Sequence, residues 1–263
     1  MKNVKIVFTD LDGTLTKEHG KIDIVNKPII VKLTSIGIPV VLSTGRPLPY
    51  VIPLCKQFGL SNYVITSNGA EVYNIKAKKV IYQSIISKEN IEKLDNLIKK
   101  YKMLFMANSI TKRYTNKTDV LGFVNVNSLL DINEDLSQVV VESLDLQDMM
   151  VFRKDLEKET TLKVANKTKH IVEGKLLYYD ITNKDSSKGE AIKTLCKHLN
   201  IDIQRTMAIG DSINDVDMFN VVGYKVAVSN ASDELKALAD TITLSNKENG
   251  VATILGQLYS ELK

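Results

Sequence analysis

The sequence predicts an α/β fold in which a core domain, built on a parallel sheet, is interrupted by a smaller inserted α+β domain. Short apolar runs rich in β-branched residues alternate with helical patterns at the start of the chain, and this alternation returns from residue 186. The segment between differs, because all five prolines precede it and only two of the thirteen glycines fall within residues 83–182. We therefore predict a core domain of residues 1–82 and 183–263, with residues 83–182 as the insertion.

The elements of the core domain can be placed in chain order. A buried strand is predicted over 4–9, and a helix over 28–36 has Pro28 in its first turn and ends at Gly37. The remaining predicted elements are strands over 38–43, 63–66, 206–209 and 225–228, and helices over 47–59, 186–199, from 214, over 233–239 and up to 258. Parallel strands joined by helices form right-handed βαβ units.

The insertion mixes both kinds of pattern. Helices are predicted near residues 89–101 and 144–156, and strand-like runs occur at 139–141 and 176–179. This mixture is typical of an α+β domain.

The composition is that of an ordinary globular chain of 263 residues, 44% of them hydrophobic and 25% charged. Its net charge of +4 forms no basic stripe, so we expect no nucleic-acid partner. Cys55 and Cys196 form no CxxC pair, and three histidines are too few for a Cys/His zinc site. Uncharged runs such as 33–45 are too short to span a bilayer, and the first residues lack an apolar signal region, so we expect a cytoplasmic protein without a membrane partner.

Two aspartates follow the first predicted strand in the sequence DLDGTLT at 10–16. Ligand sites of open α/β sheets lie at the carboxyl ends of strands, and residues two apart point to the same side, so Asp10 and Asp12 can face one crevice. Two close carboxylates repel each other and need a cation or a shared proton, and Mg²⁺ prefers such oxygen ligands. The alternatives are a turn with two solvated aspartates, or a calcium loop, whose ligand spacing this segment lacks.

Two further predicted strands of the core end in polar turns. STGR at 43–46 precedes a helix, where a hydroxyl and free N–H groups can bind a phosphate and Arg46 can pair with an anion. Alone, this segment is better explained as a helix N-cap followed by a surface arginine. SNGA at 67–70 also follows a strand, and by itself it is an ordinary Asn-Gly turn.

The last two segments of interest lie beyond the insertion. SSKGEA at 186–191 puts Lys188 at a helix start, where a lysine is usually solvated, although beside a phosphate it supplies a compact positive charge. GDSINDVDMF at 210–219 carries Asp211 and Asp215, which can serve one metal ion or can be an N-cap with first-turn acids. Because two strand-end acidic motifs occur in one α/β domain, the sequence favours the metal site.

In this order, the segments DLDGTLT, STGR, SNGA, SSKGEA and GDSINDVDMF resemble the haloacid dehalogenase-like (HAD) phosphatases, and among them the Cof-type branch with a C2B-type α/β cap. The resemblance covers essentially the whole chain, including the place of the cap at 83–182. It implies a Rossmann-like core domain and a cap domain that selects the substrate. Each segment alone is unspecific, whereas their joint order is highly specific.

The resemblance also implies a role for each matching residue. Asp10 would be the nucleophile that takes the phosphoryl group, and Asp12 the general acid and base. The implied phosphate or substrate ligands are Thr44, which precedes Gly-Arg directly and is preferred to Ser43, and Arg46, Asn68, Lys188 and Asn214. The implied Mg²⁺ ligands are Asp10, the backbone carbonyl of Asp12, and Asp211. Asp215 would either bind the metal directly or support the metal site or Lys188 without touching the metal.

The residues themselves fit this chemistry. Phosphoryl transfer has a loose transition state and needs mainly positioning and charge neutralisation, which Mg²⁺ and Lys188 can supply. An aspartyl-phosphate on Asp10 divides the displacement into two steps. We expect a Mg²⁺-dependent phosphatase acting on a small phosphorylated metabolite, first of all a sugar phosphate. The alternatives are a phosphomutase or other phosphotransferase, and a non-catalytic module that binds a phosphorylated metabolite; the specificity residues of the cap and the oligomeric state stay open.

Overall fold

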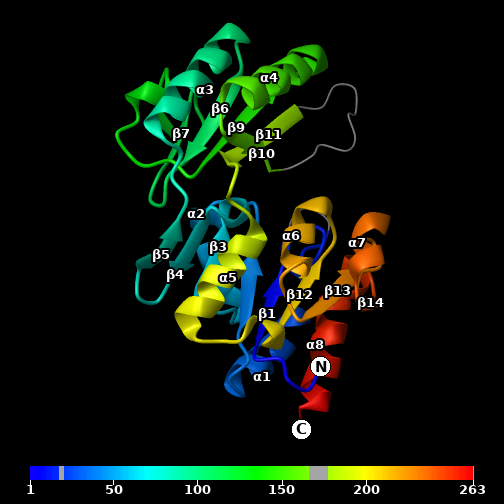
Figure 1. Cartoon of the computed structure of the whole chain (residues 1–263). Helices are drawn as coiled ribbons and strands as arrows, with labels where there is room; N and C mark the ends of the chain where they lie inside the picture. The colour runs from blue at the N-terminus through cyan, green and yellow to red at the C-terminus, as the bar shows by residue number, and fades with distance from the viewer. Residues whose placement is uncertain (18–20, 166–176, 263) are drawn as a thin grey trace. The chain divides into compact units, whose positions relative to one another are not determined.

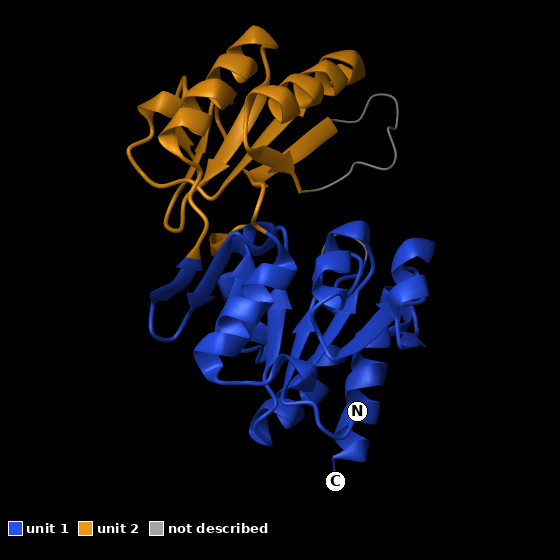
Figure 2. Ribbon diagram, viewed as in Figure 1, with its two compact units in different colours: residues 1–46, 50–82, 187–263 blue, residues 47–49, 83–186 orange. Residues whose placement is uncertain are grey.

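The computed structural model describes residues 1–17, 21–165 and 177–262. The chain divides into two compact units (Figure 2), of which unit 1 comprises residues 1–46, 50–82 and 187–263, and unit 2 comprises residues 47–49 and 83–186. Unit 2 therefore extends to residue 186, whereas the insertion was predicted to end at 182. The roles of the two units as core domain and cap domain stay a prediction.

The described residues of unit 1 form an eight-stranded sheet in the order β14-β13-β12-β1-β2-β3-β4-β5 (Figure 1). From β14 to β3 all neighbouring strands are parallel, and β4 is antiparallel to β3. The α/β fold with a parallel-sheet core is thereby confirmed. The strands are β1 (Ile6–Thr9), β2 (Val40–Ser43), β3 (Tyr63–Thr66), β4 (Glu71–Asn74), β5 (Lys79–Gln83), β12 (Thr206–Gly210), β13 (Tyr224–Val228) and β14 (Thr241–Thr243).

The helices of unit 1 cover this sheet and leave its central strands without a solvent-facing side. Every residue of β1 and β2 is buried, as expected for a parallel sheet between helices. Helices α1 and α8 contact each other, and α5 contacts β3 and β4. The helices are α1 (Asn26–Ser35), α2 (Leu48–Phe58), α5 (Lys188–Leu199), α6 (Val216–Phe219), α7 (Asp233–Leu238) and α8 (Gly250–Glu261).

The register of the central strands decides which residues meet beyond them. Thr9 at the end of β1 lies beside Ile209 of β12 on one side and Leu42 of β2 on the other. The chain therefore leaves all three strands at the same edge of the sheet, and the residues that follow them converge there.

Three parts of unit 1 differ from the sequence prediction, and the first is the short edge strand β14, which was not predicted. Strands β4 and β5 were not predicted, because the left-handed backbone at Asn68 and Gly69 turns the chain back along β3 instead of starting a helix. The helix predicted from residue 214 is only a 3₁₀ turn, Ile213–Asp215, followed by the four residues of α6. Helix α6 ends before Gly223, which lies so close to the backbone of Gln204 that a Cβ there would be 2.0 Å from its carbonyl oxygen.

The described residues of unit 2 form a six-stranded sheet in the order β10-β11-β9-β6-β7-β8. Neighbouring strands of this sheet are antiparallel, except β7 and β8, which are parallel. One hydrophobic cluster joins this sheet to helices α3 (Lys88–Lys100) and α4 (Leu146–Glu159). The strands are β6 (Leu104–Asn108), β7 (Arg113–Thr115), β8 (Val124–Asn125), β9 (Gln138–Ser143), β10 (Leu162–Val164) and β11 (Leu177–Asn183).

The predicted helices of unit 2 are confirmed, with ends shifted by one to three residues. Ser87 and Asp145 cap them by accepting a hydrogen bond from a backbone N–H of the first turn. The run at 139–141 lies within β9, and that at 176–179 corresponds to the start of β11, although residue 176 lies outside the described residues. Strands β6, β7, β8 and β10 were not predicted, because they are short and mix polar with apolar residues. Within the described ranges of both units, no helix has both the length and the apolar character needed to cross a bilayer.

Candidate active site

Three carboxylates meet at the edge of the sheet where the central strands end. Asp10 follows β1, Asp211 follows the neighbouring β12, and Asp215 ends the 3₁₀ turn after that strand. One ligand oxygen from each lies within 4.8 Å of the others. Asp215 is fully buried and Asp10 is 5% exposed, so water compensates little of their charge. The convergence predicted for Asp10, Asp211 and Asp215 is therefore found.

Asp215 is held by the turn on which it lies. Its Oδ2 accepts hydrogen bonds from the backbone N–H groups of Asp211, at 2.9 Å, and of Ser212, at 3.1 Å. Gly210 makes room for this side chain, because a Cβ at that position would lie 2.7 Å from the Cβ of Asp215. The turn thus fixes the Asp215 side chain against the end of β12. The second carboxylate oxygen of Asp215, Oδ1, has a different partner.

That partner is Lys188, the first residue of α5. Its Nζ donates to Oδ1 of Asp10 at 2.6 Å and to Oδ1 of Asp215 at 2.7 Å. The lysine is 1% exposed, and Ser187 caps its helix by accepting a hydrogen bond from the N–H of Glu190. A position where a lysine is usually solvated therefore carries a buried ammonium between two carboxylates.

The protonation of this cluster follows from burial and from its neighbours. Burial raises the pKa of Asp10 well above its usual value, Lys188 lowers it, and Asp215 and Asp211 raise it further. Burial and the nearby Asp215 raise the pKa of Asp211 to about 6. Burial alone would lower the pKa of Lys188, but Asp10 and Asp215 outweigh it and raise that pKa.

The donor set of the cluster fits a divalent cation. Three carboxylates face a single ammonium, so the ionised cluster carries an excess negative charge in a buried place. All its candidate ligand atoms are carboxylate oxygens, which hard cations such as Mg²⁺ prefer. A divalent ion would offset the burial and the repulsion from Asp215 that together raise the pKa of Asp211.

Two further residues of the first motif belong to the site and were not singled out in the sequence. The Thr14 hydroxyl donates to Oδ1 of Asp211 at 2.9 Å. Gly13 adopts a left-handed φ of +86°, and a Cβ there would lie 2.5 Å from Oδ2 of Asp211. The one sequence signal for these two residues was their position directly after Asp12 in DLDGT. Their partner, Asp211, lies about 200 residues further along the chain, so the contact could not be read from the local sequence.

Asp12 and Arg46 form an ion pair of their own. The Arg46 Nε donates to Oδ2 of Asp12 at 2.7 Å, and its Nη2 contacts Oδ1, so the two groups pair as two parallel forks. The side chain of Asp12 is about half exposed and lies outside the three-carboxylate group. The structure thus pairs Arg46 with a carboxylate, one of the two partners open to it from the sequence, and its implied role as a substrate ligand stays a prediction.

The remaining predicted ligands gather on the neighbouring loops. Thr44 follows β2, and its backbone bonds to Ile65 and to Asn68 at 3.0 Å each. Asn214 donates through Nδ2 to Oδ1 of Asn68 at 3.3 Å. Thr44 and Asn68 are 1% and 4% exposed, so both residues are buried rather than on the surface. Their roles as phosphate ligands stay a prediction.

The loop that carries Asn68 is tightly packed. Ser67, Asn68 and Gly69 all have left-handed backbones, with φ of +52°, +55° and +91°. Gly69 lies against the residues that start α5, since a Cβ there would be 2.1 Å from the carbonyl oxygen of Ser187. The loop therefore connects the predicted phosphate ligand Asn68 to the backbone at Lys188.

Gly69→Ala is expected to destabilise the protein, because it adds a clash to a left-handed backbone. The conformational strain alone is of the order of 1–3 kcal/mol, and the contact with Ser187 adds to it. Gly256→Ala in α8 is the matched control, since a Cβ there meets nothing within 4 Å. Urea unfolding of both variants tests this: equal stability of the two would show that the loop is not packed as described.

The chain is similar to known proteins over nearly its whole length. A model of the haloacid dehalogenase-like hydrolase family matches residues 7–255. Phosphatase YwpJ of Bacillus subtilis is 27% identical, with 97% of this chain and 100% of that protein covered. The 5-amino-6-(5-phospho-D-ribitylamino)uracil phosphatase YcsE of the same organism is also 27% identical, with 95% and 94% covered. A solved haloacid dehalogenase-like hydrolase from B. subtilis superposes with a TM-score of 0.83 at 25% identity, over 97% of this chain and 100% of that one.

Proposed function

The chain belongs to the haloacid dehalogenase-like hydrolases and is a phosphatase, and we propose that it hydrolyses the phosphate ester of a small sugar or sugar alcohol with the help of Mg²⁺. One observation carries the proposal. The ammonium of Lys188 is buried between Asp10 and Asp215, 2.6 and 2.7 Å away, and Asp211 lies in the same cluster. A nucleophile, a positive charge for the phosphate and a set of metal ligands are thus within reach of one another.

The first step transfers the phosphoryl group to the enzyme. A carboxylate oxygen of Asp10 forms a bond to phosphorus while the bond between phosphorus and the ester oxygen breaks. Asp12, in its protonated form, gives its proton to the departing oxygen, which leaves as an alcohol. Lys188 offsets the negative charge of the phosphoryl oxygens, and Thr44 and Asn68 bind them.

The second step releases inorganic phosphate. Asp12, now a carboxylate, takes a proton from a water molecule as the oxygen of that water bonds to phosphorus. The bond between phosphorus and Asp10 breaks, which restores the Asp10 carboxylate, and the transferred proton stays on Asp12 for the next turnover. While Asp12 is the carboxylate that accepts this proton, Arg46 orients it through the two-pronged ion pair.

Asp10, the backbone carbonyl of Asp12, and Asp211 would hold the magnesium ion. When bound, Mg²⁺ supplies positive charge that favours the approach of the anionic ester to the Asp10 carboxylate. Both oxygens of Asp215 already accept hydrogen bonds, from Lys188 and from the backbone after β12. This supports Asp215 as a residue that positions Lys188 and the turn of Asp211, not as a metal ligand itself.

The proposed substrate class rests on the relatives and on unit 2. The relative YcsE is named for an ester in which the phosphate is carried by a ribityl chain, which is a sugar alcohol. We propose that unit 2 is the cap domain, which selects among such esters and excludes water from the site. Sugar phosphates and polyol phosphates are therefore the first substrates to try.

A substrate screen tests the proposed function. Phosphate release from sugar phosphates, polyol phosphates, nucleotides, phosphoglycolate and pyridoxal phosphate is measured with Mg²⁺ and with EDTA. We expect the highest kcat/KM for a sugar or polyol phosphate, loss of release in EDTA, and recovery on adding Mg²⁺. Undiminished release in EDTA would contradict the metal assignment, and preference for a nucleotide would contradict the substrate class.

The product distinguishes hydrolysis from transfer. A phosphomutase uses the same nucleophile but hands the phosphoryl group to a sugar hydroxyl, so an isomeric sugar phosphate would accumulate in place of inorganic phosphate. A binding module would retain the ester unchanged. Release of one inorganic phosphate per ester consumed, with no isomer formed, is the outcome expected of the proposed hydrolase.

A further inference from the structure

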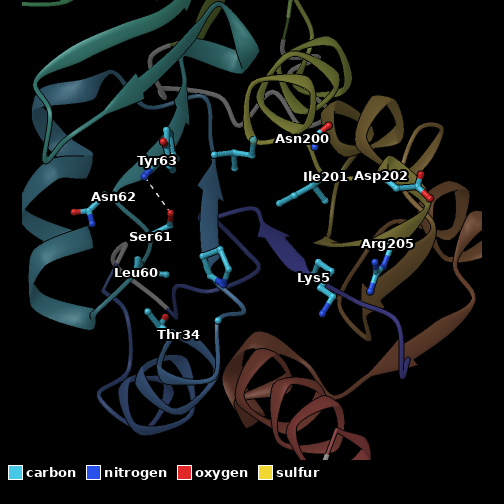
Figure 3. A pocket seen from close by; sticks show the side chains of 13 residues that line it. Lys5, Thr34, Leu60, Ser61, Asn62, Tyr63, Asn200, Ile201, Asp202 and Arg205 are labelled. Atoms are coloured by element: carbon cyan, nitrogen blue, oxygen red, sulfur yellow. Dashed lines mark hydrogen bonds between the residues drawn. The ribbon is translucent and has the colours of Figure 1, made fainter.

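A cavity of about 600 Å³ opens in unit 1 at the edge of the sheet opposite the carboxylate cluster (Figure 3). Its walls come from the residues that precede β1, β2, β3 and β12, whereas the cluster follows the ends of β1 and β12. Lys5 and Asp10 flank β1, so at 3.3 Å per residue they are separated by roughly 16 Å. The volume is within the range of small-molecule sites, and the mechanism above does not use this cavity.

One side of the cavity offers apolar surface. Leu60 and Tyr63 line it, and Ile201 faces them from the side that also carries Asp202 and Arg205. Figure 3 shows the Ile201 side chain pointing into the space between the two walls. The Tyr63 ring makes an edge-on contact with His198, at 5.9 Å between centroids, and its backbone N–H donates to Ser61 Oγ. These fixed contacts keep the apolar wall in place.

The other side of the cavity carries two positive charges. Lys5 and Arg205 are held together by a 2.7 Å hydrogen bond from the backbone N–H of Lys5 to the carbonyl of Arg205. The Arg205 Nε donates to the carbonyl of Asn3 at 3.2 Å. In the part of the chain that the structure describes, neither side chain forms an ion pair with a carboxylate. Two cationic residues that are exposed to solvent therefore line the cavity without a carboxylate partner among the described residues.

The one carboxylate of the lining does not neutralise them. Asp202 caps the turn Ile203–Arg205 by accepting a hydrogen bond from the N–H of Gln204 at 3.0 Å. Figure 3 shows its carboxylate pointing away from the side chains of Lys5 and Arg205. The cavity thus selects against cations and favours a ligand with a negative charge.

The ends of α1 and α5 also border the cavity, and a helix C-terminus by itself favours a cation. Two carbonyls in the last turn of each helix already accept hydrogen bonds, from the N–H groups of Gly37 and Ile38 after α1 and of Asn200 and Ile201 after α5. The helix-end partial charge of about half a unit is also smaller than the full charges of the two side chains. The positive charges of Lys5 and Arg205 therefore outweigh the negative partial charges of the two helix ends.

We propose that this cavity binds a small aromatic anion. The anionic group lies between Lys5 and Arg205, and the ring packs on Leu60, Ile201 and Tyr63. This ligand is distinct from the phosphate ester of the active site, so the inference does not depend on the proposed reaction.

Calorimetric titration of the full chain with naphthalene-2-sulfonate tests the proposal. We expect saturable binding of one molecule per chain, with a dissociation constant below about 1 mM. The uncharged naphthalene-2-sulfonamide is expected to bind at least about tenfold more weakly, because it lacks the charge that pairs with the two cations. Asp10→Asn, which alters the active site only, is expected to bind the sulfonate like the wild type.

Lys5→Met is the decisive variant, because it keeps an apolar stem and removes a charge that has no described ion-pair partner. It is expected to weaken sulfonate binding at least about tenfold, whereas Lys27→Met, at an exposed lysine of α1, changes nothing. Arg205→Met repeats the test on the second cation, and circular dichroism shows that each variant is folded. Absence of saturable binding, equal affinity in Lys5→Met and Lys27→Met, or loss of binding in Asp10→Asn would overturn the proposal.

Discussion

Asp10→Asn is expected to abolish phosphate release, with a loss of at least about 10³-fold in kcat. The amide has nearly the shape of the carboxylate but cannot take the phosphoryl group. Burial raises the pKa of Asp10, which means that the fold disfavours its ionised form. The Asp10→Asn protein keeps the Lys188 ammonium paired with Asp215, 2.7 Å away, so its free energy of unfolding in EDTA is expected to fall less than that of a variant that removes the lysine.

Initial rates with the best substrate of the screen and urea unfolding in EDTA measure both effects. Asp135→Asn is the matched control, since it makes the same change at an exposed aspartate of unit 2. It is expected to keep the wild-type rate and stability. An Asp10→Asn protein with the wild-type rate would remove the covalent mechanism, and one that is unfolded would show that the side chain is structural.

Lys188→Met is expected to damage both the activity and the stability of the protein. The methionine has a similar length and leaves Asp10 and Asp215 buried without the ammonium that lies 2.6 and 2.7 Å from them. Removing one partner of a buried ion pair costs about 3–5 kcal/mol. The phosphate would also lose its positive contact, so we expect kcat to fall by at least about 10²-fold.

The same substitution at Lys193 isolates the effect of burial. Lys193 lies on the same helix α5, is half exposed, and pairs with Glu190 at 2.6 Å. A surface pair of this kind contributes about 1 kcal/mol or less, so Lys193→Met is expected to be near wild type in urea unfolding and in rate. Equal stability of the two variants in EDTA would contradict the structural part of the account, and equal rates would contradict the role of Lys188.

The meeting of Asp10 and Asp211 could be predicted because it depends only on which strands are neighbours in the parallel sheet. Continuous apolar runs such as β1 and β12 are buried on both faces, and parallel neighbours end at one edge, so Asp10 and Asp211 had to converge. Lys188 followed from the order of the motifs. Its burial between two carboxylates did not, since nothing in the local sequence distinguishes it from a solvated lysine at a helix start.

The parts that the sequence missed depend on contacts between side chains that are distant in the chain. Thr14 reaches Asp211 and Arg46 reaches Asp12 only once β1, β2 and β12 are in register. Strands β4 and β5 depend on a left-handed turn at Ser67–Gly69, which the neighbouring α5 stabilises by packing. Local sequence patterns do not identify such distant partners. The sequence therefore predicted only a turn at residues 67–70, where the structure has a hairpin between β3 and β4.

Trapping of the phosphorylated enzyme tests the central claim most directly. The protein is mixed with its best substrate and Mg²⁺, quenched in acid and treated with borohydride, which reduces an acyl phosphate of aspartate to homoserine. Mass spectrometry of the peptides then locates the change. The account predicts homoserine at position 10 in the wild type and none in Asp10→Asn; modification at another residue, or none during active turnover, would contradict it.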